Sequence, residues 1–331
     1  MAGQDAYTGI EGSWVSSRPE IRILDCTIRD GGLINDHFFD DSFIKAVWDA
    51  CCAAGVDYVE MGYKASKKIF PSDKHGKWKF CDEDDIRRIV GDAPGGPTIS
   101  VMADTDRTDY HADILPREQS VIGCVRVAAY IHQIPAALDM IQDAHDKGHE
   151  TTLNLMAVST VQNKELCDAL ELVAKSPVGV VYLVDSFGAF YPLKVKELTY
   201  LYRGVLSGTG KEVGIHAHNN QQLAYANTIE AVICGANWLD STIHGLGRGA
   251  GNCPTELLIG FLKNPKFKVR PLLQCVQDHF VPLRKQLDWG YSIPYMITGQ
   301  LNQHPRAAIK ARASEQPDDY VAFWDMMMEK E

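Results

Sequence analysis

The sequence lacks most of the features that would place it in a common class at first sight. It has no CxxC pair, no basic run, no low-complexity tract and no leader pattern of a basic segment followed by an apolar one. Nowhere do about 18 apolar residues follow one another, so no transmembrane helix is expected. These absences disfavour nucleic acid and membranes as partners and favour a cytoplasmic protein.

The composition is that of an ordinary globular protein. Its 331 residues are 45% hydrophobic, which is enough for one large core or two modest ones. Lys+Arg number 33 against 43 Asp+Glu, and the net charge of -10 also weighs against anionic surfaces. The nine cysteines lie mostly inside apolar stretches, as at Cys51, Cys124 and Cys234, so we expect small core residues in a reducing compartment.

Runs of β-type and segments with helical period alternate along most of the chain. The eight β-rich runs cover 22–27, 56–63, 98–104, 124–130, 151–158, 178–186, 213–219 and 237–245. Amphipathic segments between them cover 41–55, 82–92, 134–148, 162–175 and 221–236. Strand and helix in alternation imply a parallel sheet, and eight such units in roughly 250 residues predict a (β/α)8 TIM barrel of the α/β class.

The predicted organisation has three parts. Residues 1–20 form an N-terminal extension, 21–265 the catalytic barrel, and 266–331 a C-terminal helical region, because the strand and helix rhythm stops after Lys263. Catalytic groups of such a barrel follow its strands, so candidate site residues are sought where the strands end.

Two histidines stand at the end of the seventh β-rich run, in GIHAHNNQQ. His216 and His218 are two residues apart, so in a strand both rings point to the same face. Asp30, in the turn TIRDGGLINDH after the first run, adds a carboxylate, and Gly31 and Gly32 give that turn freedom to bend. Two imidazoles and a carboxylate suit a divalent ion that must also hold substrate and water. The alternative is a pair of buried structural histidines.

A glycine-rich loop, HGLGRGAGNCPTE, follows the eighth run. Its four glycines let the backbone approach a ligand closely, and we place Gly249 and Gly251 among the substrate contacts. Asn252 can offer its amide oxygen to the metal or a hydrogen bond to the substrate. Alone, such a loop could equally be a phosphate seat or a plain turn. Beside the two histidines it indicates part of an active site.

Three stretches, LDCTIRDGG, GIHAHNNQQLAYANTIEAV and LDSTIHGLGRGAGNCPTELL, resemble the DRE-TIM metallolyase superfamily from about Arg22 to Lys263. This superfamily includes hydroxymethylglutaryl-CoA lyase, isopropylmalate and homocitrate synthases, and 4-hydroxy-2-oxovalerate aldolase, and the motifs look most like the aldolase branch. The resemblance implies that Asp30, His216 and His218 hold the metal with Asn252 nearby. It also implies that Arg29 holds the enolate oxygen.

The sequence departs from the resemblance at the expected acid–base group. Three residues after the metal-binding Asp, the synthases and the CoA lyase typically carry Gln and the aldolase a catalytic His, whereas here the residue is Leu33. His37 aligns with a second His of the aldolase loop and is the substitute candidate, the alternative being a structural histidine. Tyr295, in DWGYSIPYMITGQ, matches a catalytic tyrosine that relays a proton, the alternative being a packed aromatic.

Four polar residues interrupt otherwise apolar runs and are candidates for contacting the substrate. Arg126 in the fourth run needs an anionic partner, so it either pairs with a pocket carboxylate such as Glu60 or binds substrate. Asn154 in the fifth run and Asp185 at the end of the sixth complete the set. In the resemblance, the VDSFG strand end with Asp185 helps to shape the site.

These features predict a divalent-metal-dependent aldolase or lyase that makes or breaks a C–C bond of a 2-oxo acid through a metal-bound enolate. Mn²⁺ or Mg²⁺ is the expected ion, and two imidazoles would also accept Zn²⁺ or Co²⁺. The alternatives are a Claisen-type acyl-CoA synthase and a partner-dependent subunit. The resemblance further implies a homo-oligomer such as a dimer, and a possible complex with a dehydrogenase.

Overall fold

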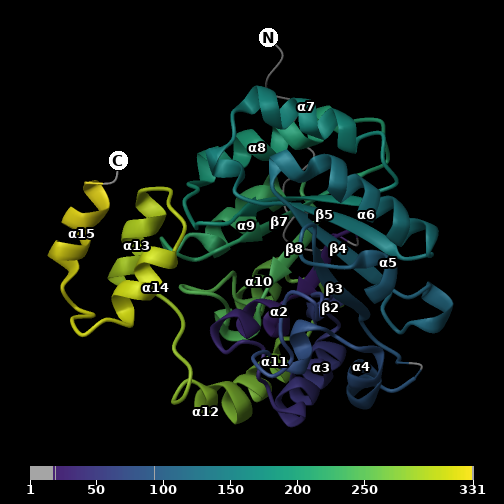
Figure 1. Ribbon diagram of the computed structural model, residues 1–331, viewed down its shortest axis with the longest axis horizontal. Coiled ribbons are helices and arrows are strands. Elements are labelled where there is room, and N and C mark those ends of the chain that lie inside the picture. Colours follow the sequence, from purple (N-terminus) through teal and green to yellow (C-terminus); the bar gives the residue numbers. More distant parts are fainter. Residues whose placement is uncertain (1–17, 19, 93, 330–331) are drawn as a thin grey trace.

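Eight parallel strands close into a barrel in the order of the sequence, β1 to β8, in a computed structural model that describes residues 18, 20–92 and 94–329 (Figure 1). The strands are β1 (Arg22–Asp25), β2 (Tyr58–Tyr63), β3 (Thr98–Asp104), β4 (Cys124–Ala129), β5 (Glu150–Leu155), β6 (Val180–Asp185), β7 (Glu212–Ala217) and β8 (Trp238–Ser241). Each strand lies within the β-rich run expected for it, or one residue outside it. The predicted TIM barrel is confirmed.

Helices follow the strands and surround the barrel. They are α2 (Thr27–Gly31), α3 (Asp41–Ala54), α4 (Glu83–Val90), α5 (Tyr110–Asp113), α6 (Ile134–Asp146), α7 (Asn163–Val173), α8 (Pro192–Val205), α9 (Ala224–Ile233) and α10 (Thr255–Leu262). A C-terminal series comprises α11 (Val269–Cys275), α12 (Val281–Leu283), α13 (Ile293–Gln300), α14 (Arg306–Arg312) and α15 (Tyr320–Met328). The N-terminal extension expected over 1–20 lies, apart from Arg18 and Glu20, outside the described residues.

Alternate residues of each strand face two different cores. In β6, Val181 and Leu183 pack under the surrounding helices, whereas Tyr182 lies inside the barrel in a cluster with Trp238 of β8. Gly214 of β7 leaves space for the Tyr182 ring, because a Cβ at that position would lie 2.6 Å from a ring carbon. This alternation directs His216 of the same strand toward the barrel interior.

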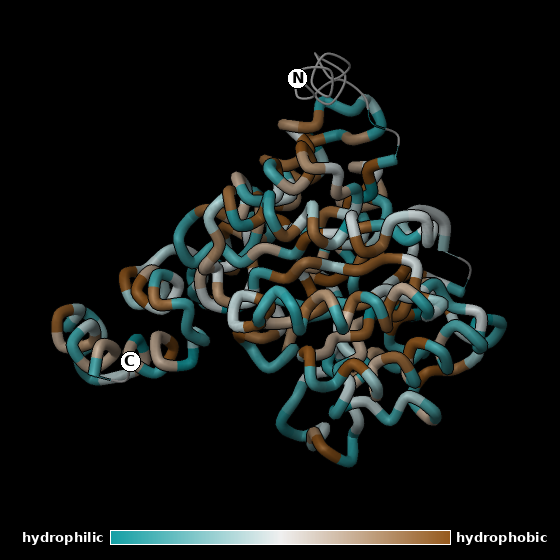
Figure 2. The backbone as a smooth tube through the Cα atoms, turned by 90° about the horizontal axis from the view of Figure 1, so that it is seen from above, coloured by the Kyte–Doolittle hydropathy of each residue, from teal (hydrophilic) through white to brown (hydrophobic). Residues whose placement is uncertain are grey.

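The helices cover the barrel through apolar faces. In α3 the residues Ile44, Val47 and Cys51 are fully buried, and the helix ends at Gly55, whose φ of 77° is left-handed. Figure 2 shows hydrophobic segments running through the middle of the molecule. All nine cysteines are free and none is fully exposed, as expected of reduced core residues.

The turn after β1 differs from the expectation of a glycine-permitted bend. Residues Thr27–Gly31 form the short helix α2, and both Gly31 and Gly32 have a right-handed φ of -60°. The reason for glycine is close packing instead, because a Cβ on Gly32 would lie 2.1 Å from Nδ1 of His37. A Cβ on Gly31 would lie 2.8 Å from the Leu246 side chain.

The C-terminal series divides into two parts. Helix α11 packs against α3 on the outside of the barrel, whereas α13 to α15 stand at one side of it in both views (Figures 1 and 2). Within the described ranges, no helix is both long enough and apolar enough to cross a membrane. His304 and Arg306, from the start of α14, nevertheless reach the mouth of the barrel.

Candidate active site

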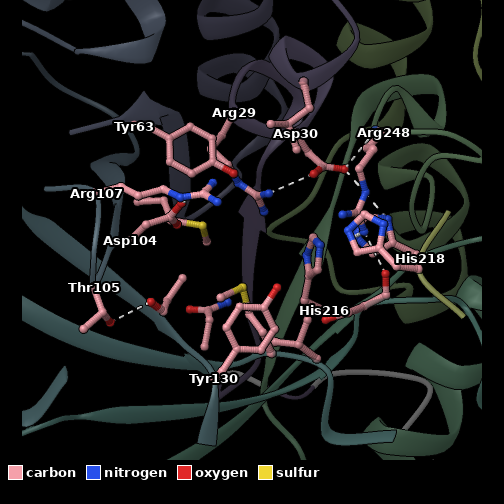
Figure 3. A pocket seen from close by; sticks show the side chains of 18 of the residues that line it. Arg29, Asp30, Tyr63, Asp104, Thr105, Arg107, Tyr130, His216, His218 and Arg248 are labelled. Carbon is pink, nitrogen blue, oxygen red and sulfur yellow. Dashed lines mark hydrogen bonds and ion pairs between the residues drawn. The ribbon is translucent and has the colours of Figure 1, made fainter. Parts of the chain in front are cut away.

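A cavity of about 490 Å³ lies at the carboxyl ends of the strands (Figure 3). One side, here called the histidine wall, comes from α2, the end of β7 and the loop after β8 and comprises Arg29, Asp30, His216, His218 and Arg248. The opposite side, here called the β3–β4 rim, comprises Asp104, Thr105, Asp106, Arg107, His132 and Gln133. Because β3 and β4 lie across a closed barrel from β7 and β8, the two walls face each other.

His216 is oriented by a carboxylate inside the barrel. Its Nδ1 lies 3.0 Å from Oδ2 of Asp240, which is fully buried. Arg126 and His216 keep the pKa of Asp240 below its usual range although burial opposes this, so the carboxylate can only accept a hydrogen bond. Nδ1 of His216 is therefore the donor, and Nε2 is left as the lone-pair nitrogen. Such a carboxylate–histidine pair is typical of metal-binding imidazoles.

His218 lies beside Asp30, with Nδ1 4.0 Å from Oδ2 of that carboxylate. Its Nε2 is 3.2 Å from Nη2 of Arg248, which also donates to the Ser186 carbonyl at 2.7 Å. Burial, reinforced by the Arg248 guanidinium, holds the pKa of His218 well below its usual range. The imidazole is consequently neutral, as a metal ligand has to be.

Arg29 connects Asp30 to the interior of the barrel. Its Nη1 donates to Oδ1 of Asp30 at 2.8 Å and its Nε to Oε2 of Glu60 at 2.7 Å. Burial alone would raise the pKa of Asp30, but Arg29 and the histidines hold it well below its usual range. Nη2 of Arg29 is buried and has no partner among the described residues. One donor of this guanidinium remains unused at the edge of the cavity.

A chain of ion pairs runs from the cavity into the barrel. Arg126 lies 3.0 Å from Oε2 of Glu60 and 2.6 Å from Oδ2 of Asp240, and all three side chains are fully buried. The Arg126 guanidinium also lies over the Tyr182 ring, 4.4 Å from its centroid. Arg29 and His216 are thus linked through alternating charges. Of the two expectations for Arg126, the structure shows the ion pair with Glu60.

The residues present fit a divalent ion. Asp30, His216 and His218 each offer a ligand atom, and these atoms all lie within 4.8 Å of one another. Nδ2 of Asn252 donates to Asp30, whereas its Oδ1 is buried with no partner within the described residues. An orphaned amide oxygen beside two imidazoles and an ionised carboxylate is the donor set expected of such a site.

The other predicted contacts occupy different places. Asn154 lines the cavity at 2% exposure, whereas Glu60 and Arg126 lie beneath it and do not line it. The Asp185 carboxylate accepts the backbone N–H groups of Ala189 at 2.8 Å and Phe190 at 3.1 Å, so it holds the turn after β6. Burial raises the pKa of Asp185 to about 7.

The glycines predicted to contact substrate support the loop after β8. A Cβ on Gly249 would lie 3.1 Å from the Tyr295 ring, and one on Gly251 would lie 2.0 Å from the Gly245 carbonyl oxygen. Both glycines have a left-handed φ, 62° and 79°. Neither lies in the lining of the cavity. Tyr295, buried in α13, packs behind this loop with the Arg312 guanidinium 5.0 Å from its ring centroid.

His37 is buried and not exposed on its loop. Its ring is 2% exposed, lies under Gly32 and meets Tyr63 edge-on at 5.4 Å between centroids. Burial, and then the charge of Lys79, holds the pKa of His37 well below its usual range, so the ring is neutral. Neither ring nitrogen has a partner in the described part of the chain. Tyr63, not His37, lines the cavity.

Sequence reasoning missed Asp240, Arg248 and the β3–β4 rim. Asp240 carried the same signal as Arg126, a charged residue at an inward position of an apolar strand. Arg248 was visible as the one arginine among the glycines of the loop after the eighth run. Apart from Asp104, which ends β3, the rim belongs to irregular connections, where spacing predicts no common direction for the side chains.

Comparison with known proteins places the chain in a known family. A model of the HMGL-like family matches residues 20–277. The 4-hydroxy-2-oxovalerate aldolase of Pelotomaculum thermopropionicum is 31% identical over 260 residues, which are 78% of this chain and 75% of that protein. The oxaloacetate decarboxylase of Mycobacterium tuberculosis is 30% identical over 246 residues, which are 73% of this chain and 69% of that protein.

Solved structures show the same architecture. The N-terminal domain of a candidate aldolase from Bacteroides vulgatus superposes with a TM-score of 0.79 at 27% identity, covering 91% of this chain and 100% of that one. Hydroxymethylglutaryl-CoA lyase from Pseudomonas aeruginosa shares the fold at 17% identity, with a TM-score of 0.66 and coverage of 82% and 95%. The family match over most of the chain and the relative at 31% identity show that this protein belongs to the HMGL-like family of DRE-TIM metallolyases.

Proposed function

We propose that the protein is a divalent-metal-dependent aldolase that makes or breaks the bond between a pyruvate-type 2-oxo acid and an aldehyde. The observation that carries the proposal is the convergence of Asp30, His216 and His218 within 4.8 Å, beside an arginine donor that the fold leaves unused. The similarity to a 4-hydroxy-2-oxovalerate aldolase supports the same reaction class.

Arg29 supplies the charge that this chemistry needs. Cleaving or forming the C–C bond places negative charge on the former keto oxygen, as an enolate. Arg29 is fixed by Glu60 and Asp30, so its free Nη2 is held at the cavity without a loss of side-chain freedom during the reaction. The guanidinium donates to the enolate oxygen and stays protonated throughout, because opposing carboxylates raise its pKa although burial opposes them.

A divalent ion held by Asp30, His216 and His218, with Asn252 as a further oxygen ligand, would supply Lewis-acid stabilisation of the same charge. Mn²⁺ and Mg²⁺ match the carboxylate and amide oxygens, and the imidazoles also admit Zn²⁺ or Co²⁺. Asp240 and Arg126 keep the imidazole of His216 in the tautomer that binds a cation.

His37 and Tyr295 remain the proposed proton-transfer groups. His37 is neutral and neither of its ring nitrogens is used by the fold, so one lone pair is available to accept a proton. Its ring meets the ring of Tyr63, which lines the cavity, edge-on and without a hydrogen bond, so a proton would need a water between His37 and the substrate. Tyr295 packs against Gly249, behind the loop that carries Arg248.

Oxaloacetate decarboxylation is a second candidate, favoured by the relative of that name at 30% identity. Loss of CO₂ from oxaloacetate leaves the enolate of pyruvate, the same intermediate as in aldol cleavage. The histidine wall serves both reactions without change. What separates them is whether the group that leaves is CO₂ or an aldehyde.

Exchange of the methyl protons of pyruvate in D₂O, followed by NMR, tests the proposal. The protein is first stripped with a chelator and then given Mn²⁺, and metal content after gel filtration is measured separately. We expect exchange only with Mn²⁺ present. The variant His216→Ala should lose both the exchange and the bound metal, because it removes one of three ligands.

The matched control is His145→Ala, a histidine with a side chain 52% exposed on the outer helix α6. It should exchange pyruvate protons and retain Mn²⁺ as the wild type does. Exchange that survives both chelation and His216→Ala would refute the metal site. Absence of exchange together with thiol release from acetyl-CoA and a 2-oxo acid would replace the aldolase with a Claisen-type synthase.

A further inference from the structure

The β3–β4 rim is a polar surface facing the histidine wall across the cavity. Figure 3 shows Asp104, Thr105 and Arg107 on the side opposite His218 and Arg248. A 2-oxo acid held at the histidine wall would direct its reacting carbon toward this rim. The rim is therefore where the second reactant, the aldehyde, lies during the aldol reaction proposed above.

Asp104 and Arg107 form the centre of the rim, and their side chains make fewer hydrogen bonds than they could. Nη1 of Arg107 lies 3.7 Å from Oδ2 of Asp104, which is too long for a hydrogen bond, and the Arg107 side chain is 55% exposed. No other side chain within the described residues pairs with either group. Burial raises the pKa of Asp104, and Lys79 and Arg107 oppose that rise. Both groups therefore retain hydrogen-bonding capacity toward a ligand.

Neighbouring contacts fix the rim in place. Gln133 donates to Asp106 and accepts the backbone N–H of Tyr130 at 2.9 Å. Thr105 donates from Oγ1 to the Ala128 carbonyl at 2.9 Å. These bonds connect the segment after β3 with β4 and its loop. The polar groups are held at fixed positions before any ligand arrives.

Asn154 adds a buried donor to the same cavity. It is 2% exposed, and its Oδ1 accepts from Thr152 at 3.4 Å, a long contact. No residue in the described part of the chain accepts from its amide nitrogen, and Asn154 lines the cavity. The amide nitrogen is therefore free to donate a hydrogen bond to a polar ligand.

The chemistry of these groups selects among aldehydes. An alkyl aldehyde would displace water from Asp104, Arg107 and Asn154 without forming hydrogen bonds in its place, which costs free energy. A second anionic group would be attracted by Arg107 and Arg306 but would also lie near the carboxylates of Asp104 and Asp106, so the lining offers it no uniformly positive surface. A hydroxyl group is both donor and acceptor, so one hydroxyl can serve a carboxylate while another accepts from a guanidinium or an amide.

We propose that the β3–β4 rim, with Asn154, binds the hydroxyl groups of a polyhydroxylated, aldose-type aldehyde. This assignment names the acceptor and rests on the proposed aldolase function. In the condensation, C3 of pyruvate loses a proton and forms a bond to the aldehyde carbon, and the aldehyde oxygen takes up a proton to become the 4-hydroxyl. The product is a 2-oxo acid with hydroxyls at C4 and beyond.

The test compares glyceraldehyde with propanal, which has the same carbon chain without the two hydroxyls, as acceptors for pyruvate. We expect kcat/KM to favour glyceraldehyde by about tenfold to a hundredfold, the worth of one or two hydrogen bonds to charged groups. Asp104→Asn should reduce that ratio by about tenfold. Asp113→Asn, a carboxylate of the same connection that does not line the cavity, should leave the ratio unchanged.

Pyruvate proton exchange, measured on each variant without an aldehyde, separates the two proposals. Exchange with no preference for glyceraldehyde, or with a preference for propanal, overturns the acceptor assignment alone. A preference for glyceraldehyde 3-phosphate or glyoxylate that Arg107→Gln abolishes also overturns it, in favour of an anionic acceptor. Absence of exchange in the wild type overturns both.

Discussion

The two walls of the cavity are built in opposite ways. On the histidine wall the charged groups continue into the barrel through Glu60, Arg126 and Asp240, each fully buried and paired at 3.0 Å or less. On the β3–β4 rim the central pair, Asp104 at the end of β3 and Arg107 after it, stands 3.7 Å apart, and the only α-helix of the connection that follows is the short α5. The histidine wall is therefore continuous with the buried interior of the barrel, whereas the β3–β4 rim lies outside that interior.

The difference matches the two tasks of the proposed aldolase. Stabilising an enolate requires charges whose positions do not change during the reaction, and burial in a network of opposite charges provides that. Recognising an acceptor requires groups that can exchange water for substrate hydroxyls, which a partly exposed rim provides. Variants on the two walls should therefore differ in whether they alter stability or selectivity.

The largest effect is expected from Arg126→Met. It leaves Asp240 buried without its guanidinium partner and Glu60 paired with Arg29 alone, and breaking a buried pair in this way typically costs about 3–5 kcal/mol. The free energy of unfolding, measured by urea denaturation, should fall by that order. The variant that also carries Asp240→Asn should recover part of the loss, because it removes the stranded charge. A loss below about 1 kcal/mol would contradict the view that this wall is part of the core.

Arg29→Lys should have the next largest effect, and on catalysis. An ammonium cannot hold Glu60 and Asp30 and still present a third donor in the same plane, as the guanidinium does. We expect pyruvate proton exchange to slow by about a hundredfold to a thousandfold, or roughly 2.7–4 kcal/mol. The metal content should remain that of the wild type, since Asp30 and both histidines are intact. An exchange rate within about threefold of the wild type would remove Arg29 from the reaction.

The same contrast explains what the sequence could predict. Asp30, His216 and His218 were predictable because each lies at or just after the end of a regular strand, and strand parity and the barrel rule bring strand ends together. Asp104 also ends a strand, β3, and the same rule could have identified it. The rest of the rim was not predictable, because Thr105 to Arg107 lie in an irregular connection whose direction depends on tertiary packing.

Glycine and histidine at the first turn show a second limit of the sequence. Gly32 suggested a flexible bend, but its φ is helical and its purpose is to admit the His37 ring. The sequence shows that position 32 is a glycine and has no Cβ. Only the structure shows that the His37 ring occupies the space that a Cβ would need. His37, the substitute acid–base candidate of the sequence, is buried under Gly32, which only the structure shows.

Asp185, at the end of β6, should give the molecule a measurable pH dependence. Its folded pKa of about 7 lies above the ordinary value of 3.8, so the native state keeps a proton that the unfolded chain releases. Stability contributed by this group is therefore complete at low pH and is lost as the pH rises from about 4 to about 7, by up to about 1.4 kcal/mol per pH unit. Asp185→Asn should flatten the decline of unfolding free energy over that range. The exposed control Asp146→Asn should not, and parallel curves for wild type and Asp185→Asn would show that the carboxylate titrates normally.

The smallest effect is expected for the free energy of unfolding of Arg107→Gln. Its side chain is 55% exposed and its only ion pair, within the described residues, is the long contact with Asp104. Exposed pairs of this kind contribute about 0–1 kcal/mol, so the free energy of unfolding should stay within about 0.5 kcal/mol of the wild type. Thermal unfolding in low and high salt measures this directly. If Arg107→Gln destabilised the protein as much as Arg126→Met, the rim would be a structural element of the barrel, and its free hydrogen-bonding groups would not be reserved for an acceptor.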